Sequence, residues 1–169
     1  NLVTVYLLVR DAYGAVSTAS ANITVEIPLL EDDSQLNELV DGLLGSTNDM
    51  LKNGDAEGVA LAVKGTSAVL NSAQFGSTSK AKADRAKLSN SLGDALDVMA
   101  PSGAVVSWIA ETLCVVLGVP EETGGDTVNA SFGIFGSLLN MSSGLSVKEG
   151  LSTYSGASIT MGLSSLMGA

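Results

Sequence analysis

The period of the hydrophobic pattern changes at Pro28, and this change divides the chain into two parts. Before Pro28, two alternating runs flank Asp11–Gly14, whose first and last residues are typical of a type I turn. Alternate residues of each run are apolar: Val3, Val5, Leu7 and Val9 in the first, and Ala19, Ala21, Ile23, Val25 and Ile27 in the second. The pattern predicts a β-hairpin over residues 1–28. A lone hairpin is marginally stable at best, so we expect its sheet partners to lie outside this chain and the chain to be a piece of a larger protein.

After Pro28 the apolar residues recur at steps of three and four, the period of an amphipathic helix. The predicted helices cover about residues 36–51, 56–71, 80–100, 102–119, 128–141 and 147–167. Pro120-Glu-Glu is typical of a helix start. The expected fold class is therefore α+β: the terminal hairpin of a β-sandwich at residues 1–28, followed by a mostly helical array of about six helices at 29–169. The most apolar run, Val105–Val119, is too short for a membrane span and contains Glu111.

The composition excludes several classes of function. A net charge of −10 argues against nucleic acid as a partner, because phosphates are neutralised by a basic surface. The chain has no His, the commonest general base and metal ligand at neutral pH. Its one cysteine, Cys114, is either a buried thiol or pairs with a cysteine outside this chain.

Three short motifs resemble functional sites and fail on their remaining residues. Asn53–Gly58 begins like a calcium loop, but position 12 is Lys64 instead of Glu, and a helix stop followed by an Asp cap explains it. Ser77-Thr-Ser-Lys80 lacks the companion motifs of the acyl-serine enzymes. Lys64-Gly-Thr has the wrong order for a phosphate loop. We therefore expect no enzyme, no cofactor and no metal site.

Three sequons are candidates for N-glycosylation, beginning at Asn22, Asn129 and Asn140. Asn22 is the best candidate, because the alternation places it on the polar face of its strand. Asn129 suits a loop. Asn140 lies among apolar residues, where burial would prevent a glycan.

Two stretches of the chain resemble known extracellular families. Val5–Gly14, with a following strand that ends at Val25–Pro28, resembles the last hairpin of PKD or fibronectin-like domains. Residues 36–71, with their Asn53-Gly-Asp turn, are similar to the helical segment of the receptor-for-egg-jelly module in polycystin-1-like proteins. The resemblance covers residues 3–73 and implies that 29–169 form the helical half of a GAIN-like domain. GAIN domains end in a Cys-rich motif with a His, so self-cleavage is not expected within this chain.

The resemblance implies a non-catalytic extracellular stalk or interaction segment of a cell-surface or ciliary protein. It would lie at the extracellular face of the plasma or ciliary membrane, attached only through other parts of the chain. Its expected partners are a polycystin-type channel subunit or an extracellular filament protein. The alternatives are a spacer in a secreted or surface adhesin or assembly glycoprotein, and an enzyme whose site is completed elsewhere.

Overall fold

The computed structural model describes residues 2–10, 16–24, 32–72 and 78–144, together with Thr160 and Ser164. The contacts divide the chain into two units, Asn1–Glu31 and Asp32–Ala169. The predicted division lay after Pro28. The predicted turn at Asp11–Gly14 lies outside the described residues, as does the end of the second predicted strand.

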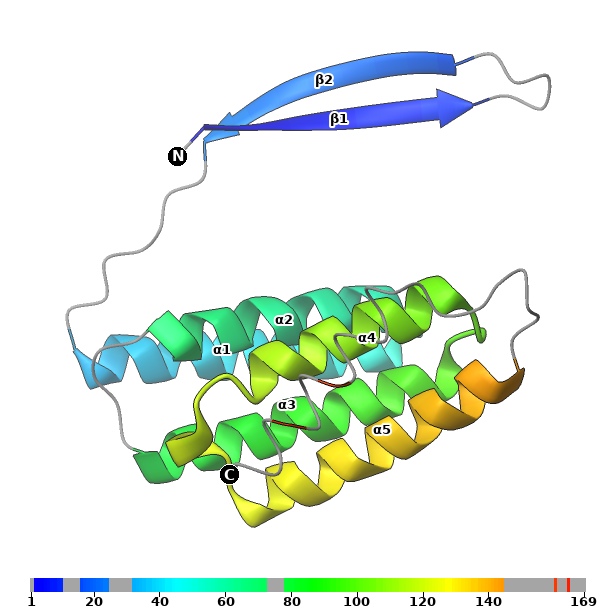
Figure 1. Cartoon of the computed structure of the whole chain (residues 1–169). Coiled ribbons are helices and arrows are strands. Elements are labelled where there is room, and N and C mark those ends of the chain that lie inside the picture. Colours follow the sequence, from blue (N-terminus) through cyan, green and yellow to red (C-terminus); the bar gives the residue numbers. More distant parts are fainter. Residues whose placement is uncertain are drawn as a thin grey trace. The chain divides into compact units, whose positions relative to one another are not determined.

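The first unit is a two-stranded antiparallel hairpin (Figure 1). Strand β1 covers Leu2–Arg10 and β2 covers Val16–Thr24, with Leu2 opposite Thr24 and Arg10 opposite Val16. Val9 and all the side chains from Val16 to Asn22 are exposed. Because neighbouring residues of a strand point to opposite faces, both faces of β2 are open over this stretch.

The second unit is a helical bundle (Figure 1). Its elements are α1 (Asp33–Lys52), α2 (Ala56–Ser72), α3 (Thr78–Val98), α4 (Gly103–Val116), the short 3-10 helix η1 (Pro120–Glu122) and α5 (Gly125–Gly144). Helix α3 contacts each of the other four α-helices and η1, so it forms the centre of the bundle.

Local signals set the ends of these helices. The Asp32 side chain accepts a hydrogen bond from the Gln35 amide at 2.9 Å and caps α1, and Ser102 caps α4 through Val105 at 3.2 Å. Gly54 ends α1 with a φ of +74°, a conformation that favours glycine. Asp55 then accepts from the Gly58 amide at 2.9 Å at the start of α2. The sequence that resembles a calcium loop is therefore a helix stop and a cap.

The core is built from one face of each helix. The central positions Leu88, Leu92 and Leu96 of α3 are at most 1% exposed. The face predicted for α2 is buried as well, through Val59, Val63, Thr66 and Leu70. Such burial of apolar faces supplies most of the stability of a helical bundle.

The expected fold class is wrong. The described strands form only one two-stranded ribbon, with no second sheet and hence no sandwich, and the described helices are five α-helices and one 3-10 turn. The helix start predicted at Pro120 forms only the 3-10 turn, in which the Thr123 amide donates to the Pro120 carbonyl. The backbone of Thr123 is extended and ends the turn, and α5 begins separately at Gly125. Of the sixth predicted helix, 147–167, the structure describes only Thr160 and Ser164. A GAIN-like array of six helices is thus not what the described residues form.

Within the described residues, none of the helices combines the length and the apolar character that crossing a membrane requires.

Candidate functional site

A groove of about 280 Å³ lies between α3 and α5 in the helical unit. Small residues open it. Gly93 stands on the α3 side, and Ala130, Gly133 and Ser137 stand on the α5 side. A methyl group at Gly133 would meet no other atom within 4 Å, and one at Gly93 would reach only the Ile134 side chain, at 3.7 Å. The groove is therefore open space rather than a gap that is already filled by side chains.

The groove has an acidic rim and an apolar floor. Asp94 and Asp97 lie on the rim and are exposed, and among the described ion pairs neither carboxylate takes part. Ile134 and Leu96 form the buried floor, at 4% and 1% exposure. A ligand in this groove would meet negative charge at its edge and hydrocarbon beneath it.

A second cavity, of about 550 Å³, lies at one end of the bundle. The α1–α2 turn and the α3–α4 connection line it, with Asp55 and Glu57 facing Val98, Met99 and Pro101. One oxygen of Asp55 already accepts the Gly58 amide in the cap of α2. This cavity is thus mainly a consequence of two helix connections that meet.

Charged groups elsewhere in the bundle join helices to one another. Lys80 on α3 donates to Asp41 on α1 at 2.9 Å and to Asp84 at 2.8 Å, and Lys64 on α2 donates to Glu111 on α4 at 3.3 Å. The hydrogen bond from Lys80 lowers the pKa of Asp41. Partial burial is the largest influence on Lys80 and lowers its pKa, but the hydrogen bonds to Asp84 and Asp41 outweigh it, so the pKa of Lys80 is raised. The ion pairs join α1 to α3 and α2 to α4, and so brace the bundle.

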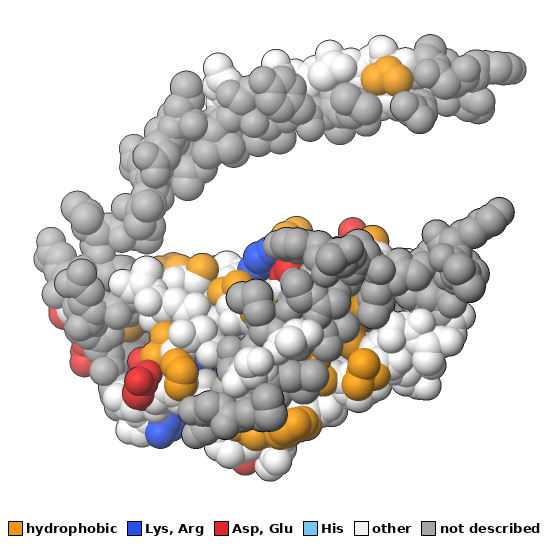
Figure 2. All heavy atoms as spheres, viewed as in Figure 1, with side chains coloured by type: hydrophobic (Ala, Val, Ile, Leu, Met, Phe, Trp, Pro, Cys, Tyr) orange, Lys and Arg blue, Asp and Glu red, His pale blue; other side chains and the backbone are white. Residues whose placement is uncertain are grey.

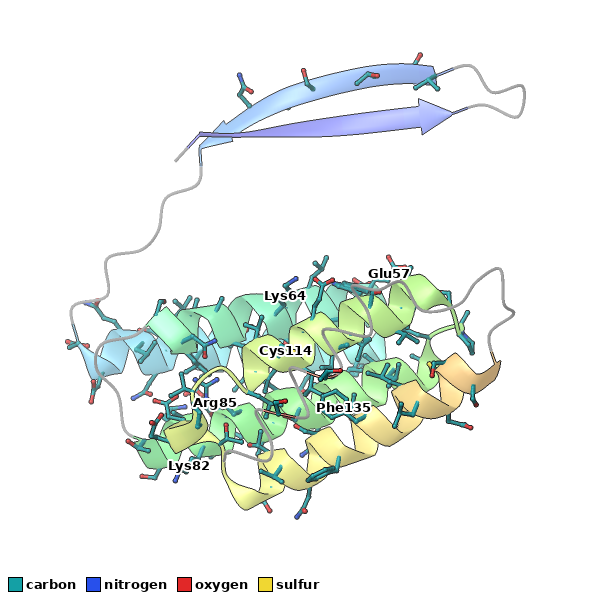
Figure 3. All side chains as sticks on the ribbon, in the orientation of Figure 1. Glu57, Lys64, Lys82, Arg85, Cys114 and Phe135 are labelled. Atoms are coloured by element: carbon teal, nitrogen blue, oxygen red, sulfur yellow. The ribbon has the colours of Figure 1, made fainter. Side chains whose placement is uncertain are left out.

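Among the described residues, the most buried charge is that of Arg85 on α3, whose side chain is 0% exposed (Figure 3). Its Nη2 and Nε donate to one oxygen of Glu122 at 2.7 and 3.1 Å, and its Nη1 donates to the Val116 carbonyl at 2.7 Å. The guanidinium therefore ties the end of α4 and η1 to the central helix. The burial of Arg85 could not be predicted from the sequence, because this residue lies in a Lys-rich stretch that is typical of a solvated helix face.

Of the described residues that were singled out from the sequence, none is among those that line this groove. Asn22 is exposed on β2, as predicted. Asn129 is exposed in the second turn of α5 and not in a loop. Asn140, where burial would have prevented a glycan, is exposed near the end of α5. Cys114 is half-buried on α4 (Figure 3) and forms no disulfide with any described residue.

The rejected motifs have structural explanations where the structure describes them. Lys80 of the Ser-x-x-Lys pattern belongs to the ion pairs with Asp41 and Asp84, and Ser77 lies outside the described residues. Lys64 pairs with Glu111. Over the described ranges, His, Cys, Asp and Glu side chains nowhere gather in a group of three that could hold a metal ion.

Among the side chains that Figure 2 colours by type, apolar ones are scattered among polar and charged ones. No family model, no curated protein and no solved structure matches this chain.

Proposed function

We propose that this chain is a non-catalytic structural and interaction segment in which the helical bundle is the support and the β-hairpin is the contact surface. The observation that carries the proposal is the exposure of the hairpin: Val9 and the side chains from Val16 to Asn22 are open to solvent. A two-stranded ribbon in this condition gains little stability by itself and gains much from a protein surface laid against it.

The two faces of the hairpin differ in chemistry. Val9 lies opposite Ser17, so it shares a face with Ser17, Ala19 and Ala21. The other face carries Thr18, Ser20 and Asn22, which are polar, and the exposed Val16 at the start of the strand. The small apolar face suits a protein partner, and the polar face suits solvent and a glycan.

The charged groups of the bundle support a mechanical role. Arg85 joins α3 to Glu122 and to the end of α4, while Lys80 joins α3 to α1. Charges that hold elements together in this way are unlike the paired acid and base of a catalytic site, which must be within reach of a substrate.

The finer proposal is an extracellular stalk segment of a polycystin-1-like cell-surface or ciliary protein, with a channel subunit or a filament protein as its partner. Its support is the resemblance over residues 3–73 and the exposure of all three sequons, Asn22, Asn129 and Asn140. The alternative is a spacer in a secreted or surface adhesin.

The location is tested by the intact mass of the protein from its native source, before and after treatment with peptide N-glycosidase. We expect a loss of mass that maps to Asn22, which would place this segment outside the cell. A mass equal to that of the bare chain would remove the support from the extracellular proposal.

The contact is tested by comparing Ala19→Lys with Ser20→Lys in the assembled native protein. The first variant puts a charge on the small apolar face and should release the partner, seen as a smaller complex in size-exclusion chromatography. The second puts the same charge on the polar face and should leave the complex unchanged. Equal behaviour of the two variants would rule out a contact through one face.

A further inference from the structure

One side of α5 is exposed along the length of the helix. Helix α5 packs against α3 and α4. On another side, a set of residues recurs at steps of four and three positions, the heptad spacing of a coiled-coil seam, and every member is exposed. The six residues of this α5 seam are Gly125, Asn129, Phe132, Gly136, Leu139 and Ser143. A seam with this spacing is the surface that a second helix covers when two helices pack side by side.

The α5 seam exposes two large apolar side chains. Phe132 and Leu139 are each 51% exposed, and they lie two turns apart on the same side of the helix. The other large apolar side chains that are exposed in the described part of the bundle, Leu61 and Val98, lie singly on α2 and α3. Single exposed apolar residues need no explanation, whereas a pair on one face of a helix suits a contact with another protein surface.

The charge of the seam indicates which surface can cover it. The chain has a net charge of −10, so two copies repel each other wherever their carboxylates meet. Helix α5 carries one charged side chain, that of Asp126 in its first turn, and its remaining residues are uncharged. Such a face offers no ion pair to a charged partner and does not repel an identical face. The charge therefore favours a second copy of this chain.

The sizes of the seam residues are self-complementary in one orientation. In an antiparallel pair, Phe132 faces Gly136 of the second copy, and Leu139 faces Asn129 of the second copy, so each large side chain meets a smaller residue. A methyl group added at Gly136 would meet no atom within 4 Å, so this position has room for a large side chain from outside. A parallel pair would place Phe132 against its own copy and leave a gap at Gly136.

From the spacing, the charge and the sizes we infer that two copies of this chain associate through antiparallel α5 helices. Each copy uses the same face, so the contact closes as a dimer. The seam is roughly 27 Å long at the rise of an α-helix, and each copy brings only two large side chains to it. This is less than a standard interface, and we expect a Kd on the order of 0.1 mM. The contact is separate from the hairpin contact proposed above.

The direct test is analytical ultracentrifugation of the full chain from about 10 µM to about 1 mM. We expect a reversible equilibrium between monomer and dimer. Asp94 and Asp97 of α3 line the groove beside Gly133, so added sodium chloride screens the repulsion between copies and should tighten the dimer by about twofold or more. A monomer at every concentration, or a dimer that dissociates in salt, would overturn the inference.

Matched variants separate the α5 seam from other exposed apolar residues. Phe132→Asp puts a charge into the seam and should weaken the dimer by more than about tenfold. Leu61→Asp puts the same charge on a similarly exposed residue of α2 and should leave the Kd within about twofold. Ala19→Lys, which tests the hairpin contact, should also leave the dimer intact. A dimer that is lost in Ala19→Lys but not in Phe132→Asp would assign the association to the hairpin and refute the inference.

A substitution at Gly136 separates the shape of the seam from its apolar character. Gly136→Leu fills the room opposite Phe132 of the second copy and should weaken the dimer by about tenfold. The same change raises the helix propensity and meets no neighbouring atom within the monomer, so the monomer should remain folded. A dimer as tight as that of the wild type, or tighter, would show that the seam is merely apolar and would contradict the antiparallel packing.

The orientation is tested by disulfide cross-linking in a Cys114→Ser background, which removes the one natural cysteine. An antiparallel pair brings Gly125 of one copy close to Ser143 of the other. A mixture of the Gly125→Cys and Ser143→Cys proteins should therefore form a disulfide-linked dimer, and neither protein should do so alone. A disulfide-linked dimer of the Ser143→Cys protein alone would indicate a parallel pair and overturn the inference.

The α5 contact also excludes a glycan at one of the three sequons. Asn129 lies within the seam, where a glycan would occupy the space of the second helix. We therefore expect Asn129 to be unmodified in the protein from its native source, whether or not Asn22 carries a glycan. Peptide mapping after treatment with peptide N-glycosidase in ¹⁸O water measures the occupancy of each site. A glycan at Asn129 would refute the contact, whereas a glycan at Asn22 bears only on the location of the chain.

Discussion

Arg85 shows how one residue joins three elements. Its guanidinium binds Glu122 and the Val116 carbonyl while its own side chain is 0% exposed. A buried arginine that is paired and hydrogen-bonded adds little to the net free energy of unfolding. Removing it is nevertheless costly, because the Glu122 carboxylate and the Val116 carbonyl lose these bonds.

We predict that Arg85→Met lowers the free energy of unfolding by about 3 kcal/mol, because Glu122 and the Val116 carbonyl lose their donors in a partly buried place. Urea denaturation followed by circular dichroism measures the change. Lys52→Met, which breaks the exposed pair with Asp49, is the control and should cost less than about 0.5 kcal/mol. A loss as small as that of the control would show that the Arg85 network is not needed.

The pair of Asp41 and Lys80 makes stability depend on pH at both ends of the scale. The pKa of Asp41 is lowered on folding from its ordinary value of 3.8. Its contribution to the free energy of unfolding is therefore present above pH 3.8 and is lost as the pH falls through the folded pKa. The pKa of Lys80 is raised on folding from its ordinary value of 10.5. Its contribution to the free energy of unfolding is therefore present below pH 10.5 and is lost as the pH rises through the higher folded pKa. We predict that Asp41→Asn loses less stability than the wild type as the pH falls below 3.8. Urea midpoints across this acid range test it, and parallel curves for the two proteins would contradict it.

At the scale of the element, the sequence was most informative where one local rule decides the outcome. Asn53-Gly54 ends α1 and Asp55 caps α2, as predicted, because a glycine at positive φ and an acidic cap need no tertiary context. The prediction of a helix start at Pro120 was wrong in extent, because a proline and two acidic residues suit a single 3-10 turn as well as a long helix.

The groove between α3 and α5 could not be predicted from the sequence. Gly93 and Gly133 lie forty positions apart in the sequence, and only the packing of α3 on α5 brings them together.

Gly45, within α1, and Gly54, just after its end, allow a matched test of backbone conformation. Gly54→Ala should lower the free energy of unfolding by about 1 kcal/mol, because its φ of +74° is strained for alanine. Gly45→Ala, in the exposed middle of α1 with no atom within 4 Å of the new methyl group, should raise it by about 0.5–1 kcal/mol. Thermal or urea unfolding of both variants gives the signs. A stabilising Gly54→Ala would mean that the turn has another conformation.

At the scale of the whole molecule, the division into two units has a simple consequence. The bundle has its own buried core, in which Leu88, Leu92, Ile109 and Leu113 are 0% exposed. The hairpin has no such core among its described side chains. The sequence analysis placed a boundary after Pro28, whereas the contacts divide the chain after Glu31. The number of helices and the exposure of both hairpin faces could not be predicted, since both depend on long-range packing.

We predict that residues 32–169 fold without the hairpin and unfold within about 3 °C of the full chain, since the bundle has a buried core of its own. Far-UV circular dichroism and a thermal melt of the two chains measure this. A truncated bundle that melts far lower, or not cooperatively, would show that the hairpin is part of the same folding unit.

The central claim is that one face of the hairpin contacts a protein partner. Photo-crosslinking in the assembled native protein tests it most directly, with the photoreactive residue placed at Ala19 in one variant and at Ser20 in the other. The account predicts an adduct from position 19 and little from position 20, because the two side chains point to opposite faces of β2. No adduct from position 19, or equal adducts from both positions, would contradict it.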